Sequence, residues 1–394
     1  MRRNLPNDSR GLAVFNRDLK LILTCNVIGS FGDGLYSYLL PVYMRETLRA
    51  DPVQIGILYA VTNLFAALTL LLAGKLADKY DRKKIMIAGW LAWLPAPLIF
   101  SFAKDWLQML PGMVMWGFWL GSPTTTAYVI TAADKQKLTL TFTTISAGWS
   151  MGYVFSPALG GYLSGIMGMQ FVFYLAFIFY ALASLTLLFI RSQRASQSTQ
   201  QTSEEQTSFF KLLRTGKLLR LSLFFASIMF VLMMFRPFVA QFLADVYRYG
   251  DFEIGIFGSV AFLSSAVLGV SLGRLGDRSR KSYALAVSMI LCSLSLVPLL
   301  LFSNFYILIT AFFIAGGSYI TWSLMSAIVG PLAPESCRAR WASIPQTVSM
   351  FSSIVAPYVG GFLYNVSPYY PFMIGIAATL IFALIASTGF LDRK

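Results

Sequence analysis

The sequence predicts an all-α integral membrane protein with twelve transmembrane helices in two pseudo-symmetric six-helix bundles. Two observations carry this prediction: the composition is far more apolar than that of a soluble protein, and three motifs occur twice at nearly one spacing. Of the 394 residues, 57% are apolar and 12% are charged, and the mean hydropathy is +0.66. Such values call for repeated membrane spans.

Each predicted span is an apolar segment long enough to cross a bilayer. A helix rises about 1.5 Å per residue, so about 20 residues cross a hydrocarbon core of ~30 Å. The predicted spans are 19–45, 53–79, 83–103, 108–133, 138–164, 169–191, 217–245, 252–277, 282–303, 305–332, 341–365 and 369–390.

Basic residues set the expected orientation. Most of the 31 lysines and arginines lie at the termini and in the loops after even-numbered spans, whereas the opposite side has only Arg45, Arg49, Lys104 and Arg248. Since cytoplasmic loops carry the excess of Lys and Arg, both termini are expected in the cytoplasm, and the protein is expected in the cell (inner) membrane. The net charge of +14 is then explained by the lipid bilayer and not by nucleic acid.

The longest polar interval, 192–216, is rich in Ser, Thr and Gln and is expected to be a flexible cytoplasmic linker. It divides the chain into an N-terminal six-helix bundle, 1–191, and a C-terminal one, 217–394. Three motifs recur between these halves at offsets of about 200 residues, which indicates a duplication and a central pathway between two parallel repeats. The pairs are 74–84 with 273–283, 156–163 with 356–363, and 54–58 with 253–257.

The first of these motifs resembles the G-x-x-x-D-x-x-x-R-[KR] signature of the major facilitator superfamily. The resemblance extends over the twelve spans, the linker and the duplicated motif, and implies the major facilitator fold and transport by alternating access. The matching residues are Gly74, Asp78, Arg82 and Lys83, with a weaker copy at Gly273, Asp277 and Arg278.

This motif has a physical role as a breakable cytoplasmic latch. Gly74 allows two helices to approach closely, and Asp78 can cap the positive N-terminal end of a neighbouring helix. The following cations, Arg82 among them, anchor at the headgroups. The resemblance implies that Asp78 meets the start of span eleven near Trp341, and Asp277 the start of span five. A topology signal alone is the alternative.

Span five resembles the glycine- and proline-rich motif of the drug:proton antiporter branch. Small residues four apart allow tight helix contact, and Pro157 can kink the helix, as can Pro357 in the second copy. Ser156 departs from the glycine usual in that branch, and span four lacks its buried arginine, so plain helix packing remains an alternative. The residues that carry the likeness are Gly148, Gly152, Ser156, Pro157, Gly160 and Gly161.

Buried charges are the candidates for the chemistry. Asp33 lies in the middle of span one, where a carboxylate must face protein or water. Aligning 39–45 with 242–248 places Asp33 opposite Arg236 of span seven, so we expect a charge pair across the cavity, with Asp33 as the proton-coupling residue. A permanent structural ion pair is the alternative.

Further polar and aromatic side chains are expected to bind the substrate. Asn26, Ser30, Asp33 and Ser37 form a polar stripe on span one. Aromatic residues in membrane helices also serve simply for packing, which is the alternative for each. The expected substrate-binding residues are Arg236, Asn26, Tyr36, Trp116, Trp119, Trp149, Tyr153, Tyr319, Trp322 and Gln346.

Composition also excludes several functions. The chain has no histidine and three scattered cysteines, so an imidazole relay, a metal set and a membrane enzyme are not expected, nor is a cofactor. It has no Walker loop for ATP. We therefore expect a monomeric secondary active transporter that couples protons to efflux of a small organic, including amphiphilic, substrate. The alternatives are proton-coupled uptake of an organic anion, a metal-ion exporter and a non-transporting membrane sensor.

Overall fold

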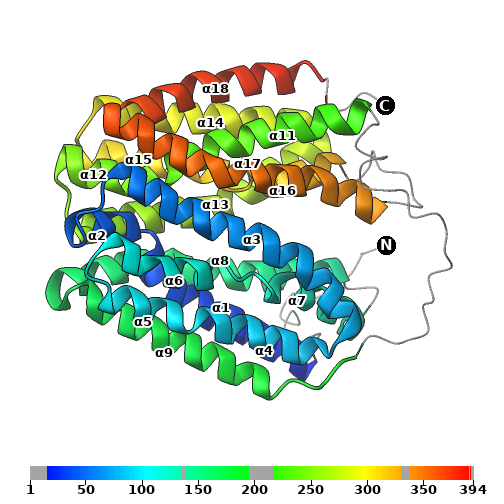
Figure 1. Ribbon diagram of the computed structural model, residues 1–394. Coiled ribbons are helices and arrows are strands. Elements are labelled where there is room, and N and C mark those ends of the chain that lie inside the picture. Colours follow the sequence, from blue (N-terminus) through cyan, green and yellow to red (C-terminus); the bar gives the residue numbers. More distant parts are fainter. Residues whose placement is uncertain (1–15, 135–137, 195–215, 330–337, 390, 392–394) are drawn as a thin grey trace, which may run out of the picture.

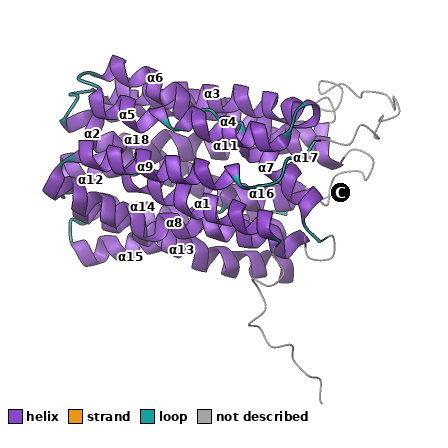
Figure 2. Ribbon diagram, turned by 90° about the horizontal axis from the view of Figure 1, so that it is seen from below, coloured by secondary structure: helices purple, strands orange, loops and turns teal. Residues whose placement is uncertain are grey.

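A computed structural model describes residues 16–134, 138–194, 216–329, 338–389 and 391. The regular elements of these residues are all helices, which run nearly parallel and are joined by short loops (Figures 1 and 2). Two of them are single 3₁₀ turns, η3 and η4. In chain order they are α1 (Arg17–Ser37), α2 (Leu40–Glu46), α3 (Pro52–Lys79), α4 (Arg82–Trp93), α5 (Pro95–Phe102), α6 (Trp106–Trp116), α7 (Gly121–Ala132), α8 (Leu138–Met167), α9 (Met169–Leu188), α11 (Gly216–Phe235), η3 (Arg236–Phe238), α12 (Val239–Tyr247), α13 (Asp251–Arg278), α14 (Lys281–Leu301), α15 (Phe305–Ala315), η4 (Gly316–Ser318), α16 (Thr321–Val329), α17 (Arg338–Val366) and α18 (Tyr370–Ser387).

These helices form the twelve predicted spans. Seven spans are one helix each, and five are two helices in succession: α1 with α2, α4 with α5, α6 with α7, α11 with α12, and α15 with α16. Within the described residues, nine segments are long and apolar enough to cross a membrane by themselves. The other three spans contain α1–α2, α6–α7 and α8, and side chains from all three meet at Asp33.

The breaks in spans one, four, seven and ten have local causes. Pro41 stands at the start of α2 and Pro237 lies in η3, and proline cannot donate the backbone bond that would continue a helix. Gly117 ends α6, and η4 begins with two glycines. Side chains satisfy the freed carbonyls: Thr69 donates to Gly117 O at 3.3 Å and Ser288 to Gly317 O at 2.8 Å. Such breaks are tolerated only inside protein.

The bundle has two distinguishable ends. Helix α9 ends and α11 begins at one end, called the linker end here, while α2 and α12 lie at the opposite end, the far end (Figure 1). The predicted linker lies mostly outside the described residues, and the bounds of the two halves stay a prediction.

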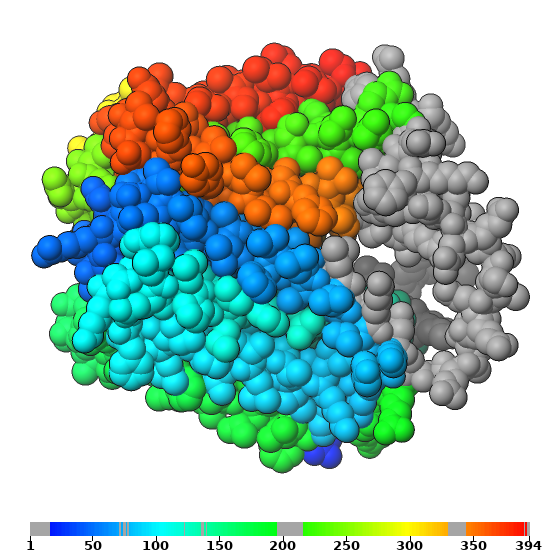
Figure 3. Space-filling model, viewed as in Figure 1, coloured from blue at the N-terminus to red at the C-terminus, as the bar shows by residue number. Residues whose placement is uncertain are grey.

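The two halves meet along two helix pairs, α3 with α17 and α8 with α13. Figure 3 shows the blue surface of α3 directly against the orange surface of α17. Hydrogen bonds cross both contacts, because Asn63 donates to Ser353 O at 2.8 Å and the Ala158 amide to Ser259 Oγ at 3.0 Å. These pairs join the repeated motifs of one half to those of the other, so the duplicated segments have a structural purpose.

Candidate functional site

Asp33 lies at the centre of the N-terminal half and is 4% exposed. Its Oδ1 accepts hydrogen bonds from Trp116 Nε1 at 2.8 Å, from the Tyr180 hydroxyl and from the Tyr36 hydroxyl at 3.2 Å. Its Oδ2 accepts one from the Tyr153 hydroxyl. The four donors come from α1, α6, α8 and α9. All of them are neutral.

This arrangement can hold a carboxyl group in either protonation state. Burial disfavours a charge, while four donors stabilise one. The indole can only donate, but each tyrosine hydroxyl can also accept, so a protonated Asp33 can donate to a tyrosine that turns. The site can therefore take up and release a proton without a bound cation.

The expected charge pair between Asp33 and Arg236 is wrong for this conformation. Arg236 donates from Nη2 to Ser318 O at 2.8 Å and to Ser318 Oγ at 3.3 Å. Its guanidinium lies over the Tyr319 ring, 4.7 Å from the centroid. The Ser318 carbonyl lies at the break of η4, where it also accepts from the Thr321 hydroxyl at 2.6 Å, and it satisfies the arginine instead of a carboxylate.

Three aromatic rings lie between the two charges. The Tyr153 ring, whose hydroxyl bonds Asp33, is 4.7 Å from the Phe262 ring across the interface of the halves. Phe262 is 5.4 Å from the Tyr319 ring, which carries Arg236 on its face. We call Tyr153, Phe262 and Tyr319 the ring bridge. It connects Asp33 in the N-terminal half to Arg236 in the C-terminal half through contacts between aromatic rings.

Other predicted substrate residues divide into two groups. Asn26, Trp119 and Trp149 line a cavity of about 320 Å³ in the N-terminal half. Trp322 and Gln346 lie in the C-terminal half, away from Asp33, and Gln346 donates to Ser326 Oγ at 3.0 Å. Trp322 is half-buried against the core. The structure thus brings Tyr36, Trp116 and Tyr153 to the carboxylate but separates Trp322 and Gln346 from it.

Several residues of this region escaped the sequence reasoning. Tyr180 bonds Asp33 from α9, but nothing in the sequence distinguishes its hydroxyl from those of Tyr174, Ser184 and Thr186 in the same span. Trp90 and Trp93 line the cavity from α4. Span three was not expected to contribute, because the sequence does not show whether a single aromatic residue in a membrane helix faces the interior or the lipid.

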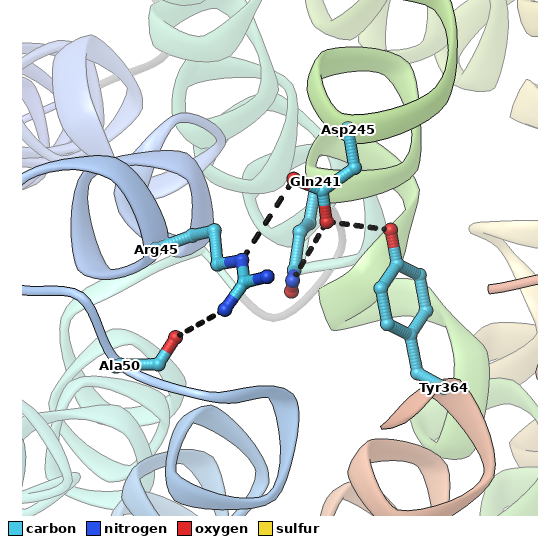
Figure 4. Close-up of polar contacts among 5 residues, drawn as sticks. All are labelled: Arg45, Ala50, Gln241, Asp245 and Tyr364. Carbon is cyan, nitrogen blue, oxygen red and sulfur yellow. Dashed lines mark hydrogen bonds and ion pairs between the residues drawn. The ribbon is translucent and has the colours of Figure 1, made fainter. Parts of the chain in front are cut away.

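A second polar cluster joins the halves at the far end (Figure 4). Arg45 on α2 and Asp245 on α12 form an ion pair at 3.8 Å. The carboxylate also accepts from Gln241 Nε2 at 3.1 Å and from the Tyr364 hydroxyl at 3.1 Å, and Arg45 donates to Ala50 O at 3.4 Å. Neither Asp245 nor the side chains that bond it were expected from the sequence as site residues.

The linker end is arranged differently. Gly74 and the side chains of Asp78 and Trp341 lie outside what the structure describes, so the expected contact of Asp78 stays a prediction. Asp277 is exposed and bonds none of the described residues, so its expected contact with the start of span five is not formed with any of them in this conformation. Gly273 and Arg278 lie beside it at the end of α13.

Arg82 acts within its own half. Its Nη1 donates to Ala127 O at 3.1 Å, to Thr131 Oγ1 at 2.7 Å and to Gln193 Oε1 at 2.8 Å. Asp81 beside it accepts from the Ser192 hydroxyl and from the amides of Gln193 and Lys83. Burial raises the pKa of Asp81, but these hydrogen bonds outweigh it, so the pKa lies below its usual range. The start of the predicted linker is thereby tied to the loop before α4.

Known proteins resemble this chain over most of its length. The family model of the Major Facilitator Superfamily matches residues 22–250 and 221–394. The multidrug resistance protein MdtG of Proteus mirabilis (strain HI4320) is 24% identical over 352 residues, which cover 86% of this chain and 87% of that protein. Multidrug resistance protein 2 of Bacillus subtilis (strain 168) is 22% identical, covering 92% and 94%.

Two solved structures show the same fold. The nucleoside transporter NupG has a TM-score of 0.74 at 16% identity and covers 95% of this chain and 98% of its own. A bacterial homologue of the iron transporter ferroportin, in an inward-facing state, has a TM-score of 0.73 at 15% identity and covers 96% and 99%. At these identities the likeness concerns the fold alone.

Proposed function

The chain belongs to the Major Facilitator Superfamily and is a membrane transporter, and on this premise we propose that it exports a small organic substrate in exchange for protons, with Asp33 carrying the coupled proton. The observation that carries the proposal is the set of four neutral donors around one buried carboxylate. A carboxylate that can be satisfied both charged and neutral is suited to repeated protonation. The names of the relatives support efflux.

The two ends of the bundle support alternating access. The far end is held closed by the pair of Arg45 with Asp245 and by the hydrogen bond from Ser164 to Asp251. At the linker end Asp277 is exposed. We take the linker end as cytoplasmic, the two halves as rocking bodies, and the protein as a monomer. The latch of Gly74 and Asp78 would form when this end closes.

The test is transport by purified protein in proteoliposomes under an imposed pH gradient. The probes are ethidium, which is a cation, and chloramphenicol and N-phenyl-1-naphthylamine, which are neutral. At least one should move against its gradient when protons flow the other way. Asp33→Asn should abolish this movement and leave counterflow of the same probe measurable, because the amide mimics the protonated acid but cannot cycle. Undiminished gradient-driven transport in Asp33→Asn would exclude Asp33 as the proton carrier.

The second candidate is proton-coupled uptake of an organic anion. It is favoured by Arg236, which has no carboxylate partner within the described residues. Uptake of benzoate with acid outside would support it, provided that Arg236→Gln loses this uptake and Arg236→Lys retains part of it. A metal exporter has less support, since the described residues contain no group of three or more His, Cys, Asp or Glu.

A further inference from the structure

The cavity in the N-terminal half has no lining residue from the C-terminal half among the described residues. Each of the described residues that line it belongs to α1, α4, α7, α8 or the break between α6 and α7. Its volume of about 320 Å³ is at the small end of the range for pockets that bind small molecules. The break in span four opens the bundle at this level, because residues 117–120 form no helix there.

Four of the residues that line it are tryptophans. The Trp93 ring lies 5.6 Å from Trp90, 5.8 Å from Trp119 and 6.3 Å from Trp149. The Trp93 indole N–H is already used, because it donates to Phe118 O at 2.8 Å, so this residue offers the cavity its ring and not its donor. Offset and edge-to-face contacts with such rings favour a flat aromatic guest.

None of the described residues that line the cavity is charged. Apart from the tryptophan indoles, the polar side chains that they provide are the amide of Asn26 and the hydroxyls of threonine and serine. Asp33 is not among the lining residues, and four donors already bond it. A cation that entered would lose hydration and would find aromatic faces but no counter-charge among these residues, whereas a neutral ring has no charge to desolvate.

We infer that this cavity binds an uncharged, flat aromatic compound with a single polar group that can reach Asn26. This inference rests on the proposed function, in that it names the substrate class of the same transporter. It also places the substrate inside one half, behind the break in span four.

The cavity shares its inner wall with the proton site. The Tyr180 ring lies 5.9 Å from Trp90 and 6.0 Å from Trp93, and the Tyr153 ring lies 6.0 Å from Trp149. Both tyrosines bond Asp33. A guest packed against these tryptophans therefore lies one aromatic layer from the carboxylate, which gives a short route for coupling without contact between substrate and acid.

The binding test compares two nearly isosteric three-ring probes, acridine and 10-methylacridinium, at pH 8, where the first is neutral and the second is a permanent cation. Binding to the purified full chain is followed by quenching of tryptophan fluorescence and by calorimetry. Acridine should bind at least tenfold more tightly. Equal or tighter binding of 10-methylacridinium would overturn the inference.

A leucine side chain placed inside the cavity, compared with one placed outside it, gives a matched pair of variants. A β-carbon at Gly121, which lines the cavity, would meet nothing within 4 Å, and the same holds for Gly165 on α8, which does not line it. Gly121→Leu should weaken acridine binding at least tenfold, whereas Gly165→Leu should leave it unchanged. Trp119→Leu, at a ring 41% exposed, should weaken it several-fold. Unchanged binding in both cavity variants would place acridine elsewhere and refute the site.

The binding test and the transport test can each refute one proposal without refuting the other. Acridine binding is measured without a pH gradient and needs no proton cycle, so Asp33→Asn should still bind acridine. Loss of coupled transport with intact acridine binding would refute the proton role and keep the cavity. Coupled transport, together with acridine binding that Gly121→Leu leaves unchanged, would refute the cavity and keep the proton role of Asp33.

Discussion

Gly255 on α13 lies so close to Pro157 on α8 that a β-carbon at Gly255 would be 2.2 Å from the proline carbonyl oxygen. The equivalent contact in the other repeat joins Gly56 on α3 to Pro357 on α17, with a corresponding distance of 2.4 Å. Both contacts lie between the halves and toward the far end. Glycine at these two positions is therefore what permits the far end to close.

Gly255→Ala should shift the protein toward states that are open at the far end, because the added methyl group meets backbone and not a flexible side chain. Spin labels on the exposed residues Leu107 and Tyr306, at the far ends of the two halves, report the change as a longer distance in pulsed electron paramagnetic resonance. Gly165→Ala is the matched control, since nothing lies within 4 Å of that position. The same distance distribution in Gly255→Ala and Gly165→Ala would contradict the role of this contact.

The Arg45–Asp245 pair should contribute modestly to closure. Its side chains are 42% and 26% exposed, and partly exposed ion pairs are worth up to about 1 kcal/mol, or about a fivefold change in population. Asp245→Asn should shift the Leu107–Tyr306 distance in the same direction as Gly255→Ala, but less. The shift should vanish at ~1 M salt. A double-mutant cycle with Arg45→Gln that gives no coupling at low salt would argue against the pair.

Much of the fold could be predicted from the sequence, because hydropathy and repetition are properties of long segments. The twelve spans follow from apolar length, and the repeated motifs mark the helix pairs that join the halves. The breaks in spans one, four, seven and ten could not be placed. Pro41 and Pro237 are visible signals, but proline is also tolerated within continuous membrane helices, as Pro111 is within α6.

The sequence predicted that Asp33 is a buried site residue, but it did not predict all of the side chains that bond it. The cost of a buried carboxylate reveals that it must have partners, but not which ones. Pairing it with Arg236 followed from charge, whereas the structure satisfies it with neutral hydroxyl and indole donors on four helices. The rotation of each helix about its axis decides between these outcomes. A single tyrosine such as Tyr180 does not reveal from the sequence which face of its helix points toward Asp33.

Removing one donor from Asp33 should change the pH dependence of transport. Tyr180→Phe keeps the ring but loses the hydroxyl that bonds Oδ1. A hydrogen bond to a charged group is worth about 1.5–3 kcal/mol, so the ionised form of Asp33 becomes less stable and the pH of half-maximal transport should rise by about 1 unit or more. Tyr174→Phe, at an exposed position on the same helix, is the control. A pH profile identical in Tyr180→Phe and wild type would count against Asp33.

Asp81 should hold the start of the linker through its ionised form. Because its pKa is lowered in the folded protein, the stabilisation is present above the usual range for aspartate and is lost only as the pH falls through the lowered value. Hydrogen exchange in 191–194, corrected for the intrinsic rate, should therefore be equally slow at pH 7 and pH 5 in the wild type. Asp81→Asn should exchange faster at both, because the amide can still cap α4 but has one acceptor oxygen and no charge for the donors that bond Asp81. Rapid exchange already at pH 5 in the wild type would disprove this account.

The ring bridge should carry the response of one half to a proton bound in the other. Phe262→Leu keeps an apolar side chain but removes two aromatic contacts, worth together about 1–3 kcal/mol beyond buried area. If protonation of Asp33 shifts the Leu107–Tyr306 distance in wild type, the shift should shrink in Phe262→Leu and stay intact in the control Phe313→Leu, whose ring is 40% exposed. Position between two sites is not itself proof of coupling. The decisive measurement is therefore the cycle of Phe262→Leu with Asp33→Asn: a coupling free energy near zero in the far-end equilibrium would mean that the rings pack the interface and transmit nothing.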